Sequence, residues 1–181
     1  MAWILKKTVV LVGMMGSGKT AVGSALARIL DVPFLDSDTE IIRAANMSIA
    51  EIFARDGENF FRARETQVIT RLMDNQRGIL STGGGAYLAP QNRAVIAEKG
   101  VAVWLRADLD LLWARVRHKT TRPLLRTANP YATLRDLCEH RNPVYAKADL
   151  TVDARADYSI EDMAGRVIEA LGTRTDVMEA E

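Results

Sequence analysis

Short apolar runs recur along the chain, and a longer stretch in which apolar residues return every third or fourth position follows most of them. A short apolar run bounded by turn residues is typical of a buried strand, and the longer period is typical of a helix that buries one face. Because a helical stretch follows each strand, we expect an α/β domain whose five-stranded, mostly parallel sheet lies between helical layers. The predicted strands are residues 9–12, 32–35, 78–82, 101–105 and 150–153.

Capping residues mark where the helices begin. Ser48 with Glu51, and Ser159 with Asp162, have the spacing of a capping box, and Pro90 suits the first turn of a helix. The predicted helices are residues 21–30, 39–45, 48–56, 58–75, 90–99, 108–117, 131–146 and 159–172.

The length of 181 residues suits one domain, and no repeat, low-complexity tract or linker divides the chain. We therefore expect a single domain over residues 1–172. The last residues, 173–181, follow the final predicted helix and are expected to fray.

The first predicted strand runs into a glycine-rich segment, residues 13–20, that ends in Lys-Thr. Its spacing is that of a phosphate-binding P-loop, and a tight turn alone would need neither the lysine nor the threonine. Glycines let backbone N–H groups face phosphate oxygens, the lysine adds a charge near the β and γ phosphates, and the threonine hydroxyl is suited to Mg²⁺. Kinases, GTPases and ATP-driven machines all carry this loop. The residues assigned to the nucleotide are Gly13, Gly16, Ser17, Gly18, Lys19 and Thr20, with Lys19 also assigned to catalysis.

Two acids follow the second predicted strand. Asp36 and Asp38 lie just past its carboxyl end, where open α/β sheets bind ligands. P-loop enzymes usually hold Mg²⁺ with a second acid at the end of an apolar strand, so Asp36 joins Thr20 as a candidate metal ligand. Asp38 is then left for the acceptor. Either acid is also suited to cap the helix at 39–45.

Three successive glycines, Gly83, Gly84 and Gly85, follow the third predicted strand; we refer to them as the glycine triplet. Each loses much backbone entropy on folding, so we interpret the triplet as a place where a ligand approaches the backbone closely. The alternative is a flexible turn.

Charge is nearly balanced over the whole chain but not along it. The net charge of +1 gives no global basic field for nucleic acid or a membrane, and neither partner is expected. Residues 111–135 contain no acid but several cations, which suggests a small anionic ligand or, alternatively, a solvated basic loop. Because neighbouring cations repel one another, we expect residues 117–130 to form a mobile lid that closes over bound polyphosphate.

The single cysteine, Cys138, excludes a disulfide framework. The N-terminus does not read as a signal peptide, and no apolar run approaches the roughly 20 residues of a membrane span. We therefore expect a cytoplasmic monomer, or a chain already cut from a precursor.

Three arginines stand beside aromatic residues or prolines that restrict their surroundings. Arg62, Arg122 and Arg141 are therefore candidates to bind a carboxylate or to offset charge on a moving phosphoryl group.

In this order, the segments resemble the shikimate kinase family, which is similar in fold to the nucleoside monophosphate kinases. The resemblance covers about residues 8–170. It rests on the P-loop, Leu35-Asp36-Ser37-Asp38, Phe60-Phe61-Arg62 with Glu65, Gly83-Gly84-Gly85-Ala86, Arg122-Pro123-Leu124-Leu125 and Arg141-Asn142-Pro143-Val144-Tyr145.

The resemblance implies a P-loop fold with three α/β/α layers, in which the γ-phosphate of ATP passes to the 3-hydroxyl of shikimate with Mg²⁺ present. Helices at about 38–75 would bind the acceptor. Asp38 would hold ring hydroxyls and serve as base, while Arg62 and Arg141 would hold the carboxylate.

The remaining roles also follow from the resemblance alone. The glycine triplet would line the pocket with backbone donors, and Phe53 and Phe61 would pack on the ring. Arg122 would reach the transferred phosphate from the lid and take part in catalysis. Arg115 would lie against adenine, and Arg155 would belong to a loop around it.

Two alternatives stay open. One is another small-molecule P-loop kinase, for gluconate or a nucleoside monophosphate. The other is a nucleotide-binding regulator without chemistry, although the guanine-specifying Asn-Lys-x-Asp is missing and Ala146-Lys147-Ala148-Asp149 comes nearest to it.

Overall fold

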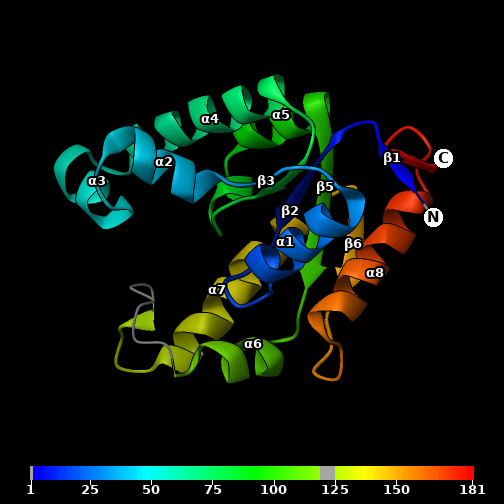
Figure 1. Ribbon diagram of the computed structural model, residues 1–181. Helices are drawn as coiled ribbons and strands as arrows, with labels where there is room; N and C mark the ends of the chain where they lie inside the picture. Colours follow the sequence, from blue (N-terminus) through cyan, green and yellow to red (C-terminus); the bar gives the residue numbers. More distant parts are fainter. Residues whose placement is uncertain (1, 119–124) are drawn as a thin grey trace.

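The computed structural model describes residues 2–118 and 125–181 (Figure 1). Its main sheet has five strands, all parallel, in the order β3-β4-β2-β5-β6. Each strand overlaps a predicted one, so the predicted five-stranded parallel sheet is confirmed. The strand bounds are β2 Thr8–Val12, β3 Phe34–Asp36, β4 Ile79–Ser81, β5 Gly100–Arg106 and β6 Leu150–Asp153.

The helices begin where the capping residues predict. Ser48 and Ser159 accept hydrogen bonds from the backbone nitrogens of Glu51 and Asp162, which completes both capping boxes. The helical bounds are α1 Lys19–Leu30, α2 Ser37–Ala45, α3 Ile49–Asp56, α4 Glu58–Asn75, η1 (a 3₁₀ turn) Ala86–Leu88, α5 Pro90–Lys99, α6 Leu109–Val116, α7 Pro130–Tyr145 and α8 Ile160–Gly172.

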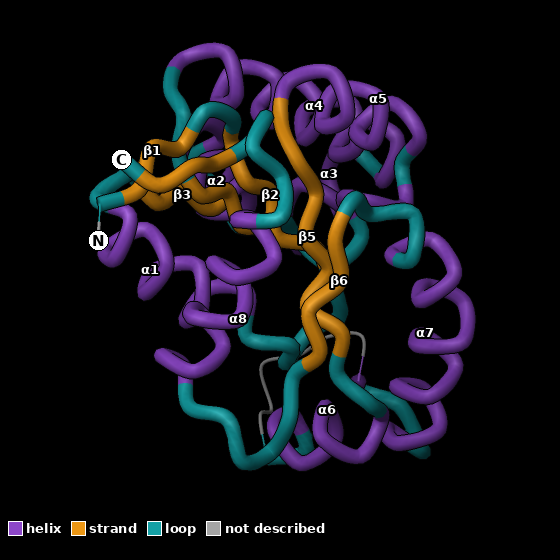
Figure 2. The backbone as a smooth tube through the Cα atoms, turned by 90° about the vertical axis from the view of Figure 1, so that its right-hand side faces the viewer, coloured by secondary structure: helices purple, strands orange, loops and turns teal. Residues whose placement is uncertain are grey.

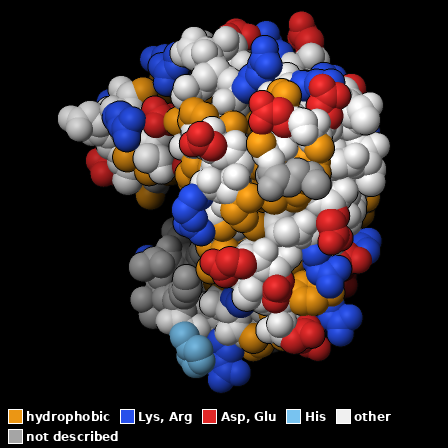
Figure 3. Space-filling view, turned by 45° about the vertical axis from the view of Figure 1, so that its right-hand side comes forward, with side chains coloured by type: hydrophobic (Ala, Val, Ile, Leu, Met, Phe, Trp, Pro, Cys, Tyr) orange, Lys and Arg blue, Asp and Glu red, His pale blue; other side chains and the backbone are white. Residues whose placement is uncertain are grey.

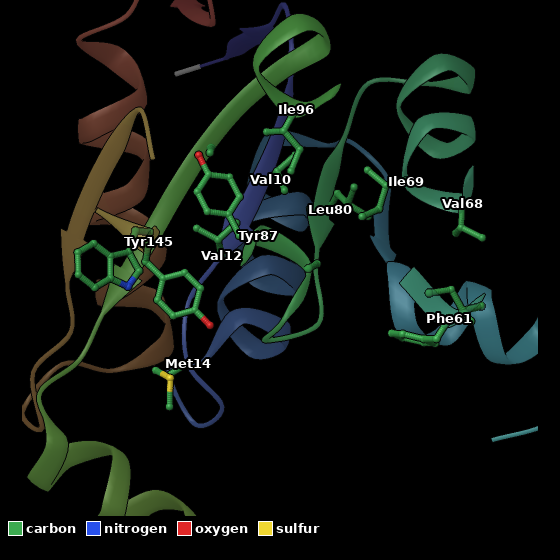
Figure 4. Close-up of a cluster of buried hydrophobic side chains, with 14 of the residues drawn as sticks. Val10, Val12, Met14, Phe61, Val68, Ile69, Leu80, Tyr87, Ile96 and Tyr145 are labelled. Carbon is green, nitrogen blue, oxygen red and sulfur yellow. The ribbon is translucent and has the colours of Figure 1, made fainter. Parts of the chain in front are cut away.

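A hydrophobic core lies on each face of the sheet. Because side chains alternate along a strand, Val9 and Leu11 of β2 enter one core, and Val10 and Val12 enter the other. Helices α1 and α8 cover the first face, and α4, α5 and α7 cover the second (Figures 1 and 2). Figure 4 shows the second core, with Val12 and Tyr145 among its members. Burial on both faces accounts for the unbroken apolar run of β2.

The carboxyl ends of β2, β3 and β4 meet at one edge of the sheet. Strand β4 lies between the other two, and its Ser81 is in register with Leu11 on one side and Asp36 on the other. The P-loop follows β2, Asp36 and Asp38 lie at the end of β3 and just past it, and the glycine triplet follows β4. Parallel pairing therefore brings these three segments together.

The C-terminal tail is ordered, which corrects the expectation that residues 173–181 fray. Strand β7 (Met178–Ala180) pairs antiparallel with β1 (Trp3–Leu5), as the adjacent chain ends in Figure 1 show. Val177 and Met178 are fully buried in the core under α1 and α8. The tail is therefore held by its apolar side chains as well as by strand pairing.

Deleting residues 174–181 should lower the thermal midpoint Tm by on the order of 10 °C. Fully burying a Val or Met side chain stabilises a fold by about 1.5–3 kcal/mol, and 1 kcal/mol shifts Tm by about 2–4 °C at this size. Deleting only residues 179–181 keeps Val177 and Met178 and should cost much less. Circular dichroism melts compare the two; an unchanged Tm for the longer deletion would contradict the packing seen for the tail.

On the face drawn in Figure 3, acidic and basic side chains are interspersed, in keeping with the net charge of +1. In the part of the chain that the structure describes, no helix has both the length and the apolar character needed to cross a membrane.

Candidate active site

A cavity of about 570 Å³ opens at the carboxyl ends of β2, β3 and β4. The P-loop forms one wall, and the acids after β3 and the first two glycines of the triplet form another. At the far end the cavity is lined by Arg115 of α6 and by Tyr158 from the loop between β6 and α8. This volume suits a small-molecule site.

The P-loop has the backbone conformation that anion binding requires. Gly18 is left-handed, with φ 97°, and caps α1 without any side-chain hydrogen bond, so the first N–H groups of the helix have no side-chain acceptor there. A Cβ on Gly13 (φ 145°) would lie 2.9 Å from the carbonyl oxygen of Leu105. Lys19 Nζ donates to the carbonyl oxygens of Gly13 (2.7 Å) and Met14 (3.1 Å). The loop therefore places the lysine side chain and the N-terminus of α1 next to each other.

Ser17 and Thr20 both line the cavity, but in different ways. Ser17 is buried, its backbone nitrogen donates to the Met14 carbonyl (3.1 Å), and its hydroxyl has no hydrogen-bond partner among the described residues. Thr20 is exposed at the start of α1. Thr20 therefore offers the accessible hydroxyl, and Ser17 supports the loop from within.

The two acids, Asp36 at the end of β3 and Asp38 at the start of α2, have separate environments. Asp36 caps α2, accepting a hydrogen bond from the Thr39 nitrogen (3.1 Å), so the helix-cap reading holds for this residue. Asp38 lies in the first turn of α2 and also lines the cavity. No group of three or more His, Cys, Asp or Glu side chains suited to a metal occurs within residues 2–118 and 125–181. A metal here would need oxygen ligands from a bound phosphate or from water besides Thr20 and Asp36.

The pKa of Asp38 is raised to about 6. Burial is the main cause, and the nearby carboxylates of Asp36 and Glu65 add to it, while Lys19 and Arg62 oppose it. A carboxyl with this pKa is ionised at neutral pH and still basic enough to take a proton from a hydroxyl.

The structure explains the glycine triplet by the side chains that approach it. A Cβ added to Gly83 would lie 2.7 Å from Asp38 Oδ1, and one added to Gly84 would lie 3.0 Å from a terminal nitrogen of Arg141. A Cβ on Gly85 would clash with the guanidinium of Arg62. Three polar side chains from distant parts of the chain thus converge on one stretch of backbone.

The triplet is held in place. The Ala86 nitrogen donates to the carbonyl of Gly83 (3.0 Å), and the hydroxyl of the buried Tyr145 donates to the carbonyl of Gly84. Burial raises the pKa of the Tyr145 hydroxyl, although Arg141 opposes the shift. The flexible-turn alternative therefore does not describe this segment.

A buried hydrogen-bond network holds Arg62. Its guanidinium donates to both carboxylate oxygens of Glu65 (2.9 and 3.2 Å), and Glu65 also accepts from Asn92 Nδ2 (3.1 Å). Burial raises the pKa of Glu65, opposed by Arg62 and Asn92. Asn92 is fully buried, donates to the carbonyl of Ala86 (2.9 Å) and accepts from the Thr66 hydroxyl (2.6 Å). One amide thus connects the arginine to the turn after the glycine triplet.

Aromatic rings lie beside this network. The ring centroids of Phe53 and Phe61 are 4.8 Å apart, and the Arg62 guanidinium carbon lies 5.1 Å from the Phe61 centroid. Phe61 is buried among the residues of the second core (Figure 4). Of the predicted acceptor residues, Asp38, Arg62 and Arg141 therefore meet at the triplet, and the Phe53–Phe61 pair lies beside Arg62.

At the nucleotide end, Arg115 donates to the carbonyl of Gly16 (2.9 Å). Arg155 does not line the cavity; it is exposed, donates to Asp157 (3.3 Å) and lies 5.6 Å from the ring of Tyr158. The ring of Tyr158 also lies 4.1 Å from the guanidinium of Arg166. The loop between β6 and α8 therefore contributes Tyr158 to the cavity lining, and the predicted Arg155 does not line the cavity.

Arg122 lies outside the described residues, as do residues 119–124 of the predicted lid. Of the rest of that segment, Leu125 is buried and packs in the second core.

Sequence reasoning assigned no role to Glu65, Asn92, Tyr145 or Tyr158. Glu65 and Tyr145 belong to segments that the family resemblance rests on, which was an available signal. Asn92 and Tyr158 lie in a helix and a loop without a distinctive pattern.

Comparisons with known proteins agree with this arrangement. The family model of shikimate kinase matches residues 15–172. A shikimate kinase of Cereibacter sphaeroides is 67% identical over 177 residues, covering 98% of this chain and 88% of that protein.

Solved structures point the same way. A shikimate kinase from Acinetobacter baumannii, solved in complex with shikimate, has a TM-score of 0.84 and 38% identity, and covers 90% of this chain and 91% of that one. A gluconokinase from Sinorhizobium meliloti has a TM-score of 0.64 over 93% of each chain, but at 18% identity it shows only a shared fold. The P-loop, the glycine triplet and the extent of these matches together show that the chain belongs to the shikimate kinase family.

Proposed function

We propose that the chain transfers the γ-phosphoryl group of ATP to the 3-hydroxyl of shikimate, giving shikimate 3-phosphate and ADP. One observation carries the proposal: Asp38, Arg62 and Arg141 converge on the glycine triplet, beside the P-loop. The similar shikimate kinase from Acinetobacter baumannii was solved in complex with shikimate, which supports the proposal. A hydroxylated carboxylate matches this set of side chains, because guanidinium groups bind carboxylates and Asp38 can bind hydroxyls.

In the proposed complex, Arg62 and Arg141 bind the carboxylate of shikimate, and the triplet faces the ring with backbone groups. Phe53 and Phe61 contact the apolar face of the ring. Glu65 fixes the orientation of Arg62, and fixed geometry is what a bidentate contact needs. These acceptor side chains lie on helices within the predicted 38–75 segment and on α7.

Asp38 is proposed as the general base. Its carboxylate takes the proton of the 3-hydroxyl while the hydroxyl oxygen bonds to the γ-phosphorus, and the bond from that phosphorus to the leaving ADP oxygen breaks. The pKa of about 6 keeps Asp38 ionised at neutral pH.

The P-loop residues bind the phosphates of ATP, and Lys19 offsets charge on the transferred group. We propose that adenine lies between Arg115 and the loop that carries Tyr158. Arg122, from the lid at 117–130, is proposed to contact the transferred phosphoryl group.

Mg²⁺ fits the oxygen donors on this side of the cavity. The Thr20 hydroxyl and the Asp36 carboxylate both line it, and Mg²⁺ in phosphoryl-transfer sites is held by one or two such groups together with phosphate oxygens and water. When bound, the ion neutralises charge on the phosphates.

Product analysis tests the assignment of the reacting hydroxyl. Phosphorus-31 NMR of a reaction with ATP and shikimate should show one phosphate monoester, coupled to the proton on carbon 3. A monoester on another carbon would contradict the placement of Asp38 against the 3-hydroxyl.

Arg62→Lys and Arg141→Lys should each raise the KM for shikimate by roughly tenfold or more, with the KM for ATP little changed. Lysine keeps the charge but cannot copy a two-point contact with a carboxylate. Steady-state kinetics with each substrate varied provides the measurement. If the KM for ATP rises first, these arginines face the nucleotide and the acceptor assignment is wrong.

Asn92→Ala should also raise the KM for shikimate, by roughly tenfold, because it removes the hydrogen bonds that Asn92 donates to Glu65 and to the Ala86 carbonyl and leaves Glu65 held by Arg62 alone among the described residues. Activity at saturating shikimate should fall less. A matched control is Asn75→Ala, which makes an equal change at the exposed C-terminal end of α4, away from this network. Equal increases in KM for both substrates would indicate general destabilisation instead of misplacement of Arg62.

We also propose that the chain acts as a monomer in the cytoplasm. The P-loop, Asp38 and the glycine triplet meet around one cavity within the chain, which supports a site completed by one copy. Sedimentation equilibrium at assay concentrations should give the mass of one chain, 20.0 kDa.

A further inference from the structure

A second cavity, of about 390 Å³, lies among α2, α3 and α4, apart from the active-site cavity. Its floor is apolar: Ile41 of α2, Ile52 of α3 and Val68 of α4 are 2%, 2% and 7% exposed. The volume falls within the range of small-molecule sites.

The cavity exists because side chains of unequal size line its two walls. Helix α2 contributes Ala44 and Ala45, which are short. Helix α4 contributes Phe60, Arg64 and Arg71, whose spacing places them along one side of the helix. The lining thus combines short side chains on α2, long ones on α4 and an apolar base of Ile41, Ile52 and Val68.

The rim carries an excess of positive charge. Arg55 of α3 joins Arg64 and Arg71 there, and no acid lines the cavity in the part of the chain that the structure describes. Arg55 pairs with Asp56 (2.7 Å) outside the lining. Arg64 donates to Gln67 (3.3 Å) and lies 5.5 Å from the ring of Phe60. Arg71 makes no hydrogen bond or ion pair within residues 2–118 and 125–181.

We propose that this cavity, here called the arginine groove, is a binding site for a small aromatic carboxylate. The carboxylate would lie at Arg64 and Arg71, since guanidinium groups bind carboxylates in two-point fashion. The ring would lie on the floor of Ile41, Ile52 and Val68, beside Phe60.

The same three helices carry residues of the proposed acceptor site close to the cavity lining. Asp38 lies one turn before Ile41, Phe53 follows Ile52 directly, and Glu65 lies one turn before Val68. Asp38 lies on α2 and Arg62 lies on α4. A ligand bound between these two helices therefore changes the distance between Asp38 and Arg62. On the proposed function, occupancy of the arginine groove therefore changes the affinity for shikimate, which is a coupling between two sites.

Binding is tested with 2-naphthoate, a fluorescent aromatic carboxylate, in the presence of saturating ADP and shikimate to fill the active site. The groove variant is Arg64→Gln/Arg71→Gln. A matched control, Arg28→Gln/Arg135→Gln, removes the same charge from exposed positions on α1 and α7. Uncharged 2-naphthamide tests the contribution of the carboxylate. A second groove variant, Ala45→Leu, fills the hollow without changing charge.

The proposal expects 2-naphthoate to bind the wild type and the control equally, and at least tenfold more weakly to both groove variants. 2-Naphthamide should bind at least tenfold more weakly than 2-naphthoate to the wild type. Binding that is unchanged in the groove variants, or absent from the wild type, would overturn the proposal.

The coupling between the arginine groove and the shikimate site is measured by steady-state kinetics. Saturating 2-naphthoate should change the KM for shikimate at least twofold in the wild type and not in Arg64→Gln/Arg71→Gln. A change that persists in the variant would mean direct competition at the active site, and no change in the wild type would remove the coupling; either result contradicts the proposal. Because binding is measured without turnover, its failure is distinct from a failure of the proposed kinase activity, which would appear as absent ADP release.

Discussion

Replacing Asp38 with asparagine is expected to lower the turnover of shikimate by on the order of a thousandfold, because a positioned general base contributes about 10²–10⁴ to rate. Asparagine keeps the size of the side chain and its ability to bind a hydroxyl, but cannot take the proton. The KM for shikimate should therefore change much less than kcat. Stopped assays of ADP release over long times give both quantities.

The pH profile identifies the same group. Asp38 acts as the carboxylate, so the wild-type kcat/KM for shikimate should fall tenfold per unit of pH below about 6, the pKa of Asp38 in the protein. Above that pH the profile should be level until another group titrates. Asp136→Asn makes the same chemical change on the exposed surface of α7 and should keep both the rate and the profile. An Asp38→Asn variant with near-wild-type turnover would remove Asp38 from the role of base.

Replacing Lys19 with alanine should reduce turnover by about a hundredfold or more, which corresponds to roughly 3 kcal/mol of lost transition-state stabilisation. In the structure Lys19 is half-buried, and its Nζ donates to two carbonyl oxygens of the P-loop. The loop conformation is also supported by other backbone hydrogen bonds, from Ser17 to Met14 and from Val22 to Gly18. The variant should therefore fold with an unchanged Tm.

Lys147→Ala, an exposed lysine after α7, is the control for the loss of a charge. It should retain wild-type kcat and KM for both substrates. Full turnover in Lys19→Ala would refute the phosphate-binding role of the loop, whereas loss of activity together with a large drop in Tm would show that Lys19 is structural.

Most of the fold could be predicted because its elements carry local signals. The apolar run of β2 and the capping boxes at Ser48 and Ser159 act over a few neighbouring residues, and the structure has these elements where the pattern indicates them. Parallel strands separated by helices then leave few topologies.

The β1–β7 pair could not be predicted in the same way. Each strand has only three residues, and the partner of Leu5 is Met178, at the opposite end of the chain. Propensity over three residues is a weak signal, and the stabilising contacts of Val177 and Met178 exist only after the core has formed. The sequence of residues 173–181 therefore predicts a frayed tail, although the structure has a paired strand there.

The candidate active site also combines features that have a local sequence signal with features that depend on contacts between distant residues. The P-loop and the glycine triplet are visible as motifs, because backbone requirements restrict residue type at those positions. The sequence does not show that Gly83 and Gly85 make room for Asp38 and Arg62, since those contacts join different elements. The role of Asn92 depends on a buried hydrogen-bond network and leaves no local pattern.

The most direct test of the central claim is ADP release by the wild-type chain with ATP and Mg²⁺ across four acceptors: shikimate, gluconate, AMP and CMP. We expect ADP to appear in proportion to added shikimate, with the other three at the level of the reaction without acceptor. Equal ADP release with gluconate or a nucleotide would contradict the assignment of Asp38, Arg62 and Arg141 to a hydroxylated ring carboxylate. ADP release that does not depend on the acceptor concentration would contradict it as well.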